Sequence, residues 1–156
     1  MEQTTEKTTV VREIAIDASP ETVWGFLTDP DKVLRWWGQS ISFDPRPGGE
    51  FVVVVSRTHT ARGEFVELDE PRRLVYTWGW DGGTPDQELV PPGSTTVEIN
   101  LEPTGAGTML RFRHSGLPNA ESAQAHAEGW DHYLGRFLVA VSGADPGPDP
   151  WAGAPE

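Results

Sequence analysis

The sequence predicts an α+β domain with a curved antiparallel β-sheet of about seven strands. Two short helices follow the first strand, and a long C-terminal helix packs across the sheet over a cavity. The prediction depends on two observations. Residues 119–142 are the one segment with a helical period over several turns, and most of the chain before them has the period and composition of strands. A helix with a single apolar stripe must bury that stripe, and the sheet is the available surface.

The C-terminal helix is expected to run from Asn119 to Ser142, with Asn119 as its N-cap and Gly143 as its stop. Its apolar stripe centres on Trp130, and we expect Trp130 and Phe137 to be buried against the sheet. At about 100° per residue, the stripe comprises Ala123, His126, Trp130, Tyr133, Leu134, Phe137 and Val141. The opposite face comprises Glu121, Gln124, Glu128, His132 and Arg136.

The segments before this helix are mostly short and rich in β-branched and aromatic residues. Strands are expected over residues 10–16, 41–44, 51–57, 60–68, 73–80, 95–102 and 108–114. Ser19-Pro20 and Asp29-Pro30 each indicate a helix start, and the second short helix is expected to continue through Trp37. Residues 81–94 show neither a helix nor a strand period, so they predict a long loop, of a length that is usually functional or disordered.

The chain is expected to form one domain over residues 10–142. Residues 1–9 are polar and predict a disordered N-terminus, and residues 143–156 predict a flexible Gly/Pro-rich tail in which Trp151 could dock. On the faces of two neighbouring strands, Arg111 and Arg113 are expected to pair with Glu98 and Asn100 across the sheet.

Charge and composition exclude several classes of function. A net charge of −12 argues against nucleic acid and against an anionic membrane surface, because both require a basic patch. The chain has no Cys, which excludes disulfides and thiol chemistry. It shows neither a signal peptide nor a run of 18 apolar residues, so we expect a cytoplasmic protein without a membrane partner. A monomer and a homodimer both remain open.

Aromatic residues and histidines on inward faces are the candidate ligand-binding residues. They are Trp36, Trp37, Tyr76, Trp78, Phe112, His114, His126, Trp130 and Tyr133. Trp36 and Trp37 either both fill the core, or one fills the core while the other faces a pocket mouth. Tyr76 and Trp78, with Trp80, line a cavity if their strand face is inward and form a partner surface if it is outward.

The histidines predict neither a metal site nor a cofactor site. His126 and His132 lie about 240° apart on the helix, so they cannot share an ion. No phosphate loop, nucleophile elbow or dinucleotide fingerprint occurs, and no catalytic residue is assigned. His114 and His126 could meet Tyr133 as a group suited to proton transfer. The alternative is structural, with each imidazole hydrogen-bonded to backbone where strand meets helix.

Four segments together resemble a known family. They are VVREIAIDASPETVWGFLTDPDKVLRWWG near the N-terminus, the Pro-Gly-Gly turn at 47–49, the hairpin RGEFVELDEPRRLVYTWGW, and HSGLP before a helix with Gly129-Trp130. Over residues 10–142 the chain resembles the homologues of the activator of heat-shock-protein-90 ATPase, a branch of the START-like (SRPBCC) helix-grip superfamily. The resemblance implies a helix-grip fold with a hydrophobic cavity under the last helix. It does not imply one activity.

Three functions therefore remain as hypotheses. The first is a domain that binds a small hydrophobic or aromatic ligand between the C-terminal helix and the sheet, with residues 81–94 as a lid. The second is a protein-binding domain that stimulates a chaperone ATPase, which predicts an exposed apolar patch and a filled cavity. The third is an enzyme of the polyketide cyclase or dehydratase type that uses His114, His126 or Tyr133, which predicts a perturbed titratable group in the cavity.

Overall fold

The computed structural model describes residues 4–6 and 8–150. Expectations about residues 1–3, 7 and 151–156, including the docking of Trp151, lie outside the described residues. The described chain forms one antiparallel sheet in the strand order β1-β2-β8-β7-β6-β5-β4-β3. The strands are β1 (Thr4–Glu6), β2 (Thr9–Ile16), β3 (Ser40–Phe43), β4 (Glu50–Ser56), β5 (His59–Asp69), β6 (Arg73–Trp78), β7 (Thr95–Thr104) and β8 (Gly107–Ser115).

All seven expected strands are present as β2 to β8. The eighth, β1, is a correction, because it forms within the N-terminal residues that the sequence indicated as disordered. β1 pairs with β2, so Thr4 lies opposite Val11. Backbone hydrogen bonding to an open sheet edge needs no apolar side chain, and composition alone therefore failed to predict this strand.

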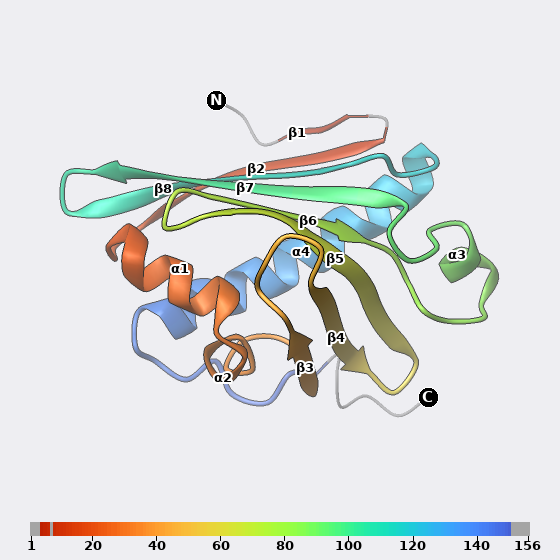
Figure 1. Ribbon diagram of the computed structural model, residues 1–156, viewed down its shortest axis with the longest axis horizontal. Helices are drawn as coiled ribbons and strands as arrows, with labels where there is room; N and C mark the ends of the chain where they lie inside the picture. Colours follow the sequence, from red (N-terminus) through yellow and green to blue (C-terminus); the bar gives the residue numbers. More distant parts are fainter. Residues whose placement is uncertain (1–3, 7, 151–156) are drawn as a thin grey trace.

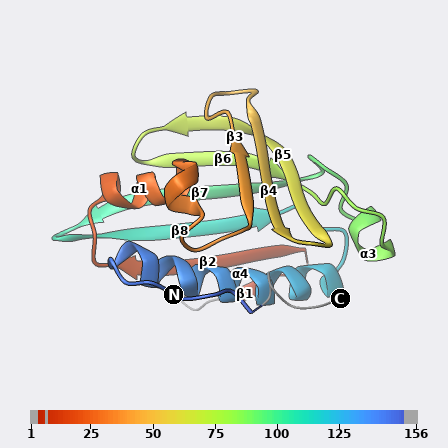
Figure 2. The ribbon, with the colours of Figure 1, turned by 90° about the horizontal axis from the view of Figure 1, so that it is seen from below.

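The helices are α1 (Pro20–Thr28), α2 (Pro30–Val33), α3 (Pro85–Glu88) and α4 (Ala120–Val141). The predicted caps are confirmed: Ser19, Asp29 and Asn119 each accept a hydrogen bond from a backbone N–H of the following turn. α2 ends at Val33 rather than Trp37, and the chain continues as a turn. α4 crosses one face of the sheet, with α1 and α2 at one end and α3 at the other (Figures 1 and 2).

The short helix α3 corrects the expectation of a plain loop over residues 81–94. Thr84 caps it by accepting a hydrogen bond from Gln87 N, and the Gln87 side chain accepts one from Thr84 N in return. This reciprocal capping box, followed by Pro85 at the first helical position, was legible in the sequence Thr-Pro-Asp-Gln. Four residues are too few for a hydrophobic period, so the search by period missed it.

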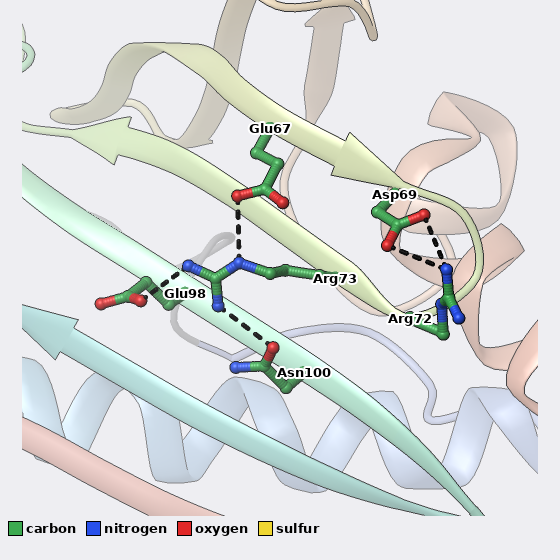
Figure 3. A network of polar contacts seen from close by, with 6 residues as sticks. All are labelled: Glu67, Asp69, Arg72, Arg73, Glu98 and Asn100. Atoms are coloured by element: carbon green, nitrogen blue, oxygen red, sulfur yellow. Dashed lines mark hydrogen bonds and ion pairs between the residues drawn. The ribbon is translucent and has the colours of Figure 1, made fainter.

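The face of the sheet away from α4 is held by charged pairs across strands, as Figure 3 shows. Arg73 on β6 contacts Glu67 on β5 and both Glu98 and Asn100 on β7. Charges do pair across the strands, but the expected partners were wrong: Arg73 contacts Glu98 and Asn100, whereas Arg111 pairs with Glu13 and Glu102. With one face polar, the sheet has a single apolar face, and α4 covers it.

The described part of the C-terminal tail folds back on α4. Arg136 donates to the backbone oxygens of Trp36 and Gly147, each at 3.0 Å. His132 Nε2 lies 2.8 Å from Asp149 Oδ1. Both side chains lie on the polar face of α4, and their contacts hold the tail as far as residue 149.

Candidate ligand-binding cavity

A cavity of about 830 Å³ opens between the N-terminal half of α4, the β4–β5 hairpin and residues 81–94, which contain α3 and are called the α3 segment below. Its floor is formed by the indoles of Trp37, Trp78, Trp80 and Trp130 together with Tyr133. The α4 side contributes Asn119, Glu121, Ser122, Ala125, His126 and Gly129. The hairpin contributes Val55, Ser56 and His59, and the α3 segment contributes Thr84, Asp86, Gln87 and Leu89. The size and the aromatic lining are typical of a small-molecule site.

The aromatic floor is a continuous cluster. Trp37 stacks on Trp78 with ring centroids 5.8 Å apart, and Trp130 lies 5.1 Å from Trp78. Trp80 meets Trp78 edge to face at 5.2 Å. These contacts bury three of the four rings almost completely, so the floor is rigid.

The remaining space between α4 and the sheet is filled. A void there has a volume of about 10 Å³, and Trp36, Tyr76 and Phe112 are among the residues that line it. Trp36 stacks on Trp37 at 5.2 Å and donates to Phe26 O. These three predicted site residues are therefore packed in the core beneath α4. The cavity lies at the α3 end of the groove, and Trp37 alone of the tryptophan pair lines it.

His114 is buried behind the floor and does not line the cavity. Trp130 Nε1 donates to His114 Nδ1 at 3.0 Å, and His114 Nε2 lies 2.8 Å from Thr95 Oγ1. An indole N–H can only donate, so Nδ1 carries a lone pair and the proton is on Nε2. Burial, and secondarily the neighbouring His126, lowers the pKa of His114 well below 6.5.

His126 lies in the cavity wall, 5.3 Å from His114 between ring centroids. Its Nε2 accepts a hydrogen bond from Trp80 Nε1 at 3.0 Å, so the proton is on Nδ1, which donates to Ser122 O at 2.8 Å. Burial lowers the pKa of His126, although the bond to Ser122 opposes the shift. The two imidazoles thus meet as expected, but every ring nitrogen already has a partner.

Tyr133 interacts with the C-terminal tail, which separates it from the proton-transfer group that the sequence suggested. Burial, and secondarily the hydrogen bond to Asp149, raises the pKa of Tyr133. Its ring lies edge to face with His132 at 4.7 Å. Tyr133 therefore contributes to the aromatic wall while its hydroxyl faces the tail.

The α3 segment forms the outer wall of the cavity, and it is anchored. Gln87 is buried, and its Nε2 donates to Thr58 O in the β4–β5 turn at 2.7 Å. Trp80 N donates to Val90 O at 2.7 Å. Leu89, between these anchors, is 53% exposed although it lines the cavity. In this structure the segment is therefore a fixed wall of the cavity, and the lid hypothesis stays a prediction.

One buried polar atom in the floor lacks a partner. Trp78 is 3% exposed, and its Nε1 makes no hydrogen bond with the described residues. A buried donor left in this way costs about 1–3 kcal/mol.

Of the nine site residues predicted from the sequence, five line the cavity: Trp37, Trp78, His126, Trp130 and Tyr133. It missed the polar mouth, including Ser56, Asp86 and Glu121. Their position depends on how a hairpin, a loop and a helix start converge. The capping box at Thr84 was the one local signal that the α3 segment is ordered.

Two further searches of the described residues gave negative results. No group of three His, Cys, Asp or Glu side chains has an arrangement that could hold a metal ion. None of the helices is long and apolar enough to span a membrane.

Comparison with known proteins identifies relatives of this chain. The family described as "Activator of Hsp90 ATPase homolog 1-like protein" matches residues 17–143. An AHSA1-like protein of Rhizobium etli is 46% identical over 100% of this chain and 96% of its own, with a TM-score of 0.73. No curated protein matches significantly.

Two more distant structures share the fold. DynU16, from the dynemicin biosynthetic locus, is 24% identical over 90% of this chain and 49% of its own, with a TM-score of 0.74. The Aha1 dimer of Colwellia psychrerythraea is 23% identical over 85% of this chain and 95% of its own, with a TM-score of 0.70. The helix-grip fold, the match over residues 17–143 and the close relative together show that this chain belongs to the Activator of Hsp90 ATPase homolog 1-like family.

Proposed function

We propose that this domain binds a small hydrophobic or aromatic molecule in the cavity beside the N-terminal half of α4. The observation that carries the proposal is a cavity of about 830 Å³ whose floor is built from four indoles. A site of this kind buries a ligand against aromatic rings beside a few polar side chains, the combination that is usual in small-molecule pockets. That DynU16 belongs to a biosynthetic locus agrees with a small-molecule role.

The same geometry argues against the two alternative functions. A chaperone-stimulating surface requires a contiguous exposed apolar patch. Among the described residues, the large exposed hydrophobic side chains are Leu34, Val66 and Leu89, in three separate segments, and the adjacent pair Leu138 and Val139 on α4. A cyclase or dehydratase would need a free base, and both nitrogens of His126 are already hydrogen-bonded. Binding without catalysis fits the site best.

Two glycines of α4 provide a matched test. A side chain at Gly129 would enter open space on the cavity side, and one at Gly135 would enter open space on the exposed side of the helix. Replacing glycine in a helix interior gains up to about 1 kcal/mol of stability, so neither variant should unfold. Gly129→Leu places a side chain in the cavity and reduces its volume, whereas Gly135→Leu leaves it unchanged.

The probe is N-phenyl-1-naphthylamine, a neutral aromatic dye that fluoresces in apolar surroundings. We expect saturable binding to the unmodified chain, a loss of roughly tenfold or more in affinity for Gly129→Leu, and a change within about twofold for Gly135→Leu. Equal affinity in all three proteins would place the dye elsewhere and refute the proposal. Native mass spectrometry of the purified protein would then identify the natural ligand from any bound mass.

A further inference from the structure

We propose that the natural occupant of this cavity is an organic cation, an aromatic or polycyclic molecule bearing a protonated or quaternary amine. The inference rests on the proposed function and specifies its ligand class. It comes from the charges around the cavity: the described lining residues include the carboxylates of Asp86 and Glu121 and neither lysine nor arginine. A carboxylate or phosphate ligand would find no cation there.

The carboxylates of Asp86 and Glu121 differ from several other acids of this protein, because those acids are paired with an arginine. Asp81, Asp44 and Glu98, for example, are each neutralised by an arginine. Asp86 and Glu121 form no ion pair with any of the described residues. Their charges therefore remain available at the mouth, so the potential there is negative.

The buried histidine of the lining, His126, does not offset these charges. His126 Nε2 accepts a hydrogen bond from Trp80 Nε1. Protonation of Nε2 would replace that bond with two N–H groups facing each other, so it is disfavoured. His59 Nδ1 lies 2.9 Å from Thr58 Oγ1 and 3.3 Å from Ser56 Oγ, and its ring lies edge to face with Trp80. The remaining titratable lining residue, Tyr133, stays neutral because burial raises its pKa.

The start of α4 is the one feature at the cavity that favours an anion. The positive end of a helix dipole attracts negative charge. Here the Asn119 side chain accepts from Ser122 N at 2.7 Å, and the Glu121 carboxylate lies in the first turn. Asn119 caps the positive end of the helix dipole and Glu121 neutralises it, so the start of α4 attracts a ligand carboxylate only weakly.

The aromatic floor supplies the second attraction. The faces of indole rings carry partial negative charge and attract cations, most strongly where water is excluded. Trp37, Trp78 and Trp130 are each less than 5% exposed because they pack on one another, whereas Trp80 is partly exposed and is the indole that a ligand can reach most readily. An amine at the mouth meets carboxylates, and an amine deeper in the cavity meets indoles, so both positions favour positive charge.

The test uses three probes that share one ring system and differ in charge: 2-(aminomethyl)naphthalene, 2-naphthalenemethanol and 2-naphthoate. Affinities are measured near pH 7 by calorimetry or by tryptophan fluorescence. We expect the amine to bind roughly 3- to 30-fold more tightly than the alcohol, and the naphthoate most weakly. The ratio of amine to alcohol affinity should shrink as NaCl is raised from about 50 to about 500 mM.

Two double variants assign the preference to the mouth. Asp86→Asn with Glu121→Gln should reduce the ratio of amine to alcohol affinity toward one. Glu21→Gln with Glu128→Gln removes the same charge at exposed positions outside the lining and should leave the ratio unchanged. The cation inference fails if the amine binds no more tightly than the alcohol, or if the naphthoate binds best. The proposed binding function still stands in that case, provided that Gly129→Leu weakens binding of the alcohol. If no probe binds, both fail.

Discussion

Acidification should unfold this protein through the two histidines that tie the sheet to α4. His114 Nδ1 accepts from Trp130 on α4, and His126 Nε2 accepts from Trp80 after β6. Protonation of either atom would replace a hydrogen bond with two opposed donors. Both pKa values are lowered below 6.5 in the folded chain, principally by burial.

The sign and the size of the effect follow from linkage. Below pH 6.5 the unfolded chain takes up protons at these histidines while the folded chain resists them, so the free energy of unfolding decreases as pH decreases. Above that value both states are neutral and the contribution to stability is complete. Each histidine contributes a slope of at most about 1.4 kcal/mol per pH unit, between its unfolded and folded pKa values.

The assay is urea unfolding at about pH 7.5, 6.5 and 5.5, with the free energy of unfolding obtained by linear extrapolation. His114→Gln is the informative variant, because an amide can still accept from Trp130 and donate to Thr95 but does not titrate. It should be less stable at neutral pH and show a smaller decrease in acid, and His126→Gln should do the same. A free energy of unfolding that is equal at pH 7.5 and 5.5 in the unmodified chain would refute this reasoning.

Three further outcomes are expected from the packing and the charged pairs. Trp130→Ala should cost about 3–5 kcal/mol in denaturant melts, because a nearly fully buried indole leaves a cavity and an unpaired His114; a loss below about 1 kcal/mol would mean that α4 does not hold the sheet as described. Deleting residues 144–156 should lower the free energy of unfolding by about 1–2 kcal/mol, because Arg136 and His132 lose their tail partners; an unchanged melting temperature would show that these contacts contribute nothing. Arg73→Ala should lower the free energy of unfolding by about 1–2 kcal/mol because Arg73 joins three strands. Arg72→Ala removes only the exposed pair with Asp69 and should lower it by less than about 0.5 kcal/mol. Equal losses would contradict the cooperative role of the network in Figure 3.

Local patterns in the sequence were enough to predict most elements of this fold. The apolar stripe centred on Trp130, the Asn119 cap and the Gly143 stop predicted α4 to within one residue at each end. Alternation and turn residues predicted β2 to β8. These features depend on neighbours within one or two turns of the chain, which is why they are legible without a structure.

The tertiary structure alone decided which ends of these elements meet. β2 lies beside β8, so Val10 faces His114 across more than a hundred residues of chain, and no local signal specifies that pair. The same long-range convergence brings α3 and the β4–β5 hairpin to the start of α4, which makes a cavity there and leaves the groove beside Phe112 filled. The histidine tautomers were also beyond the sequence, because each proton's position is set by an indole N–H from another element. Packing density and hydrogen-bond partnership are properties of side chains that are distant in sequence, and only folding brings them into contact.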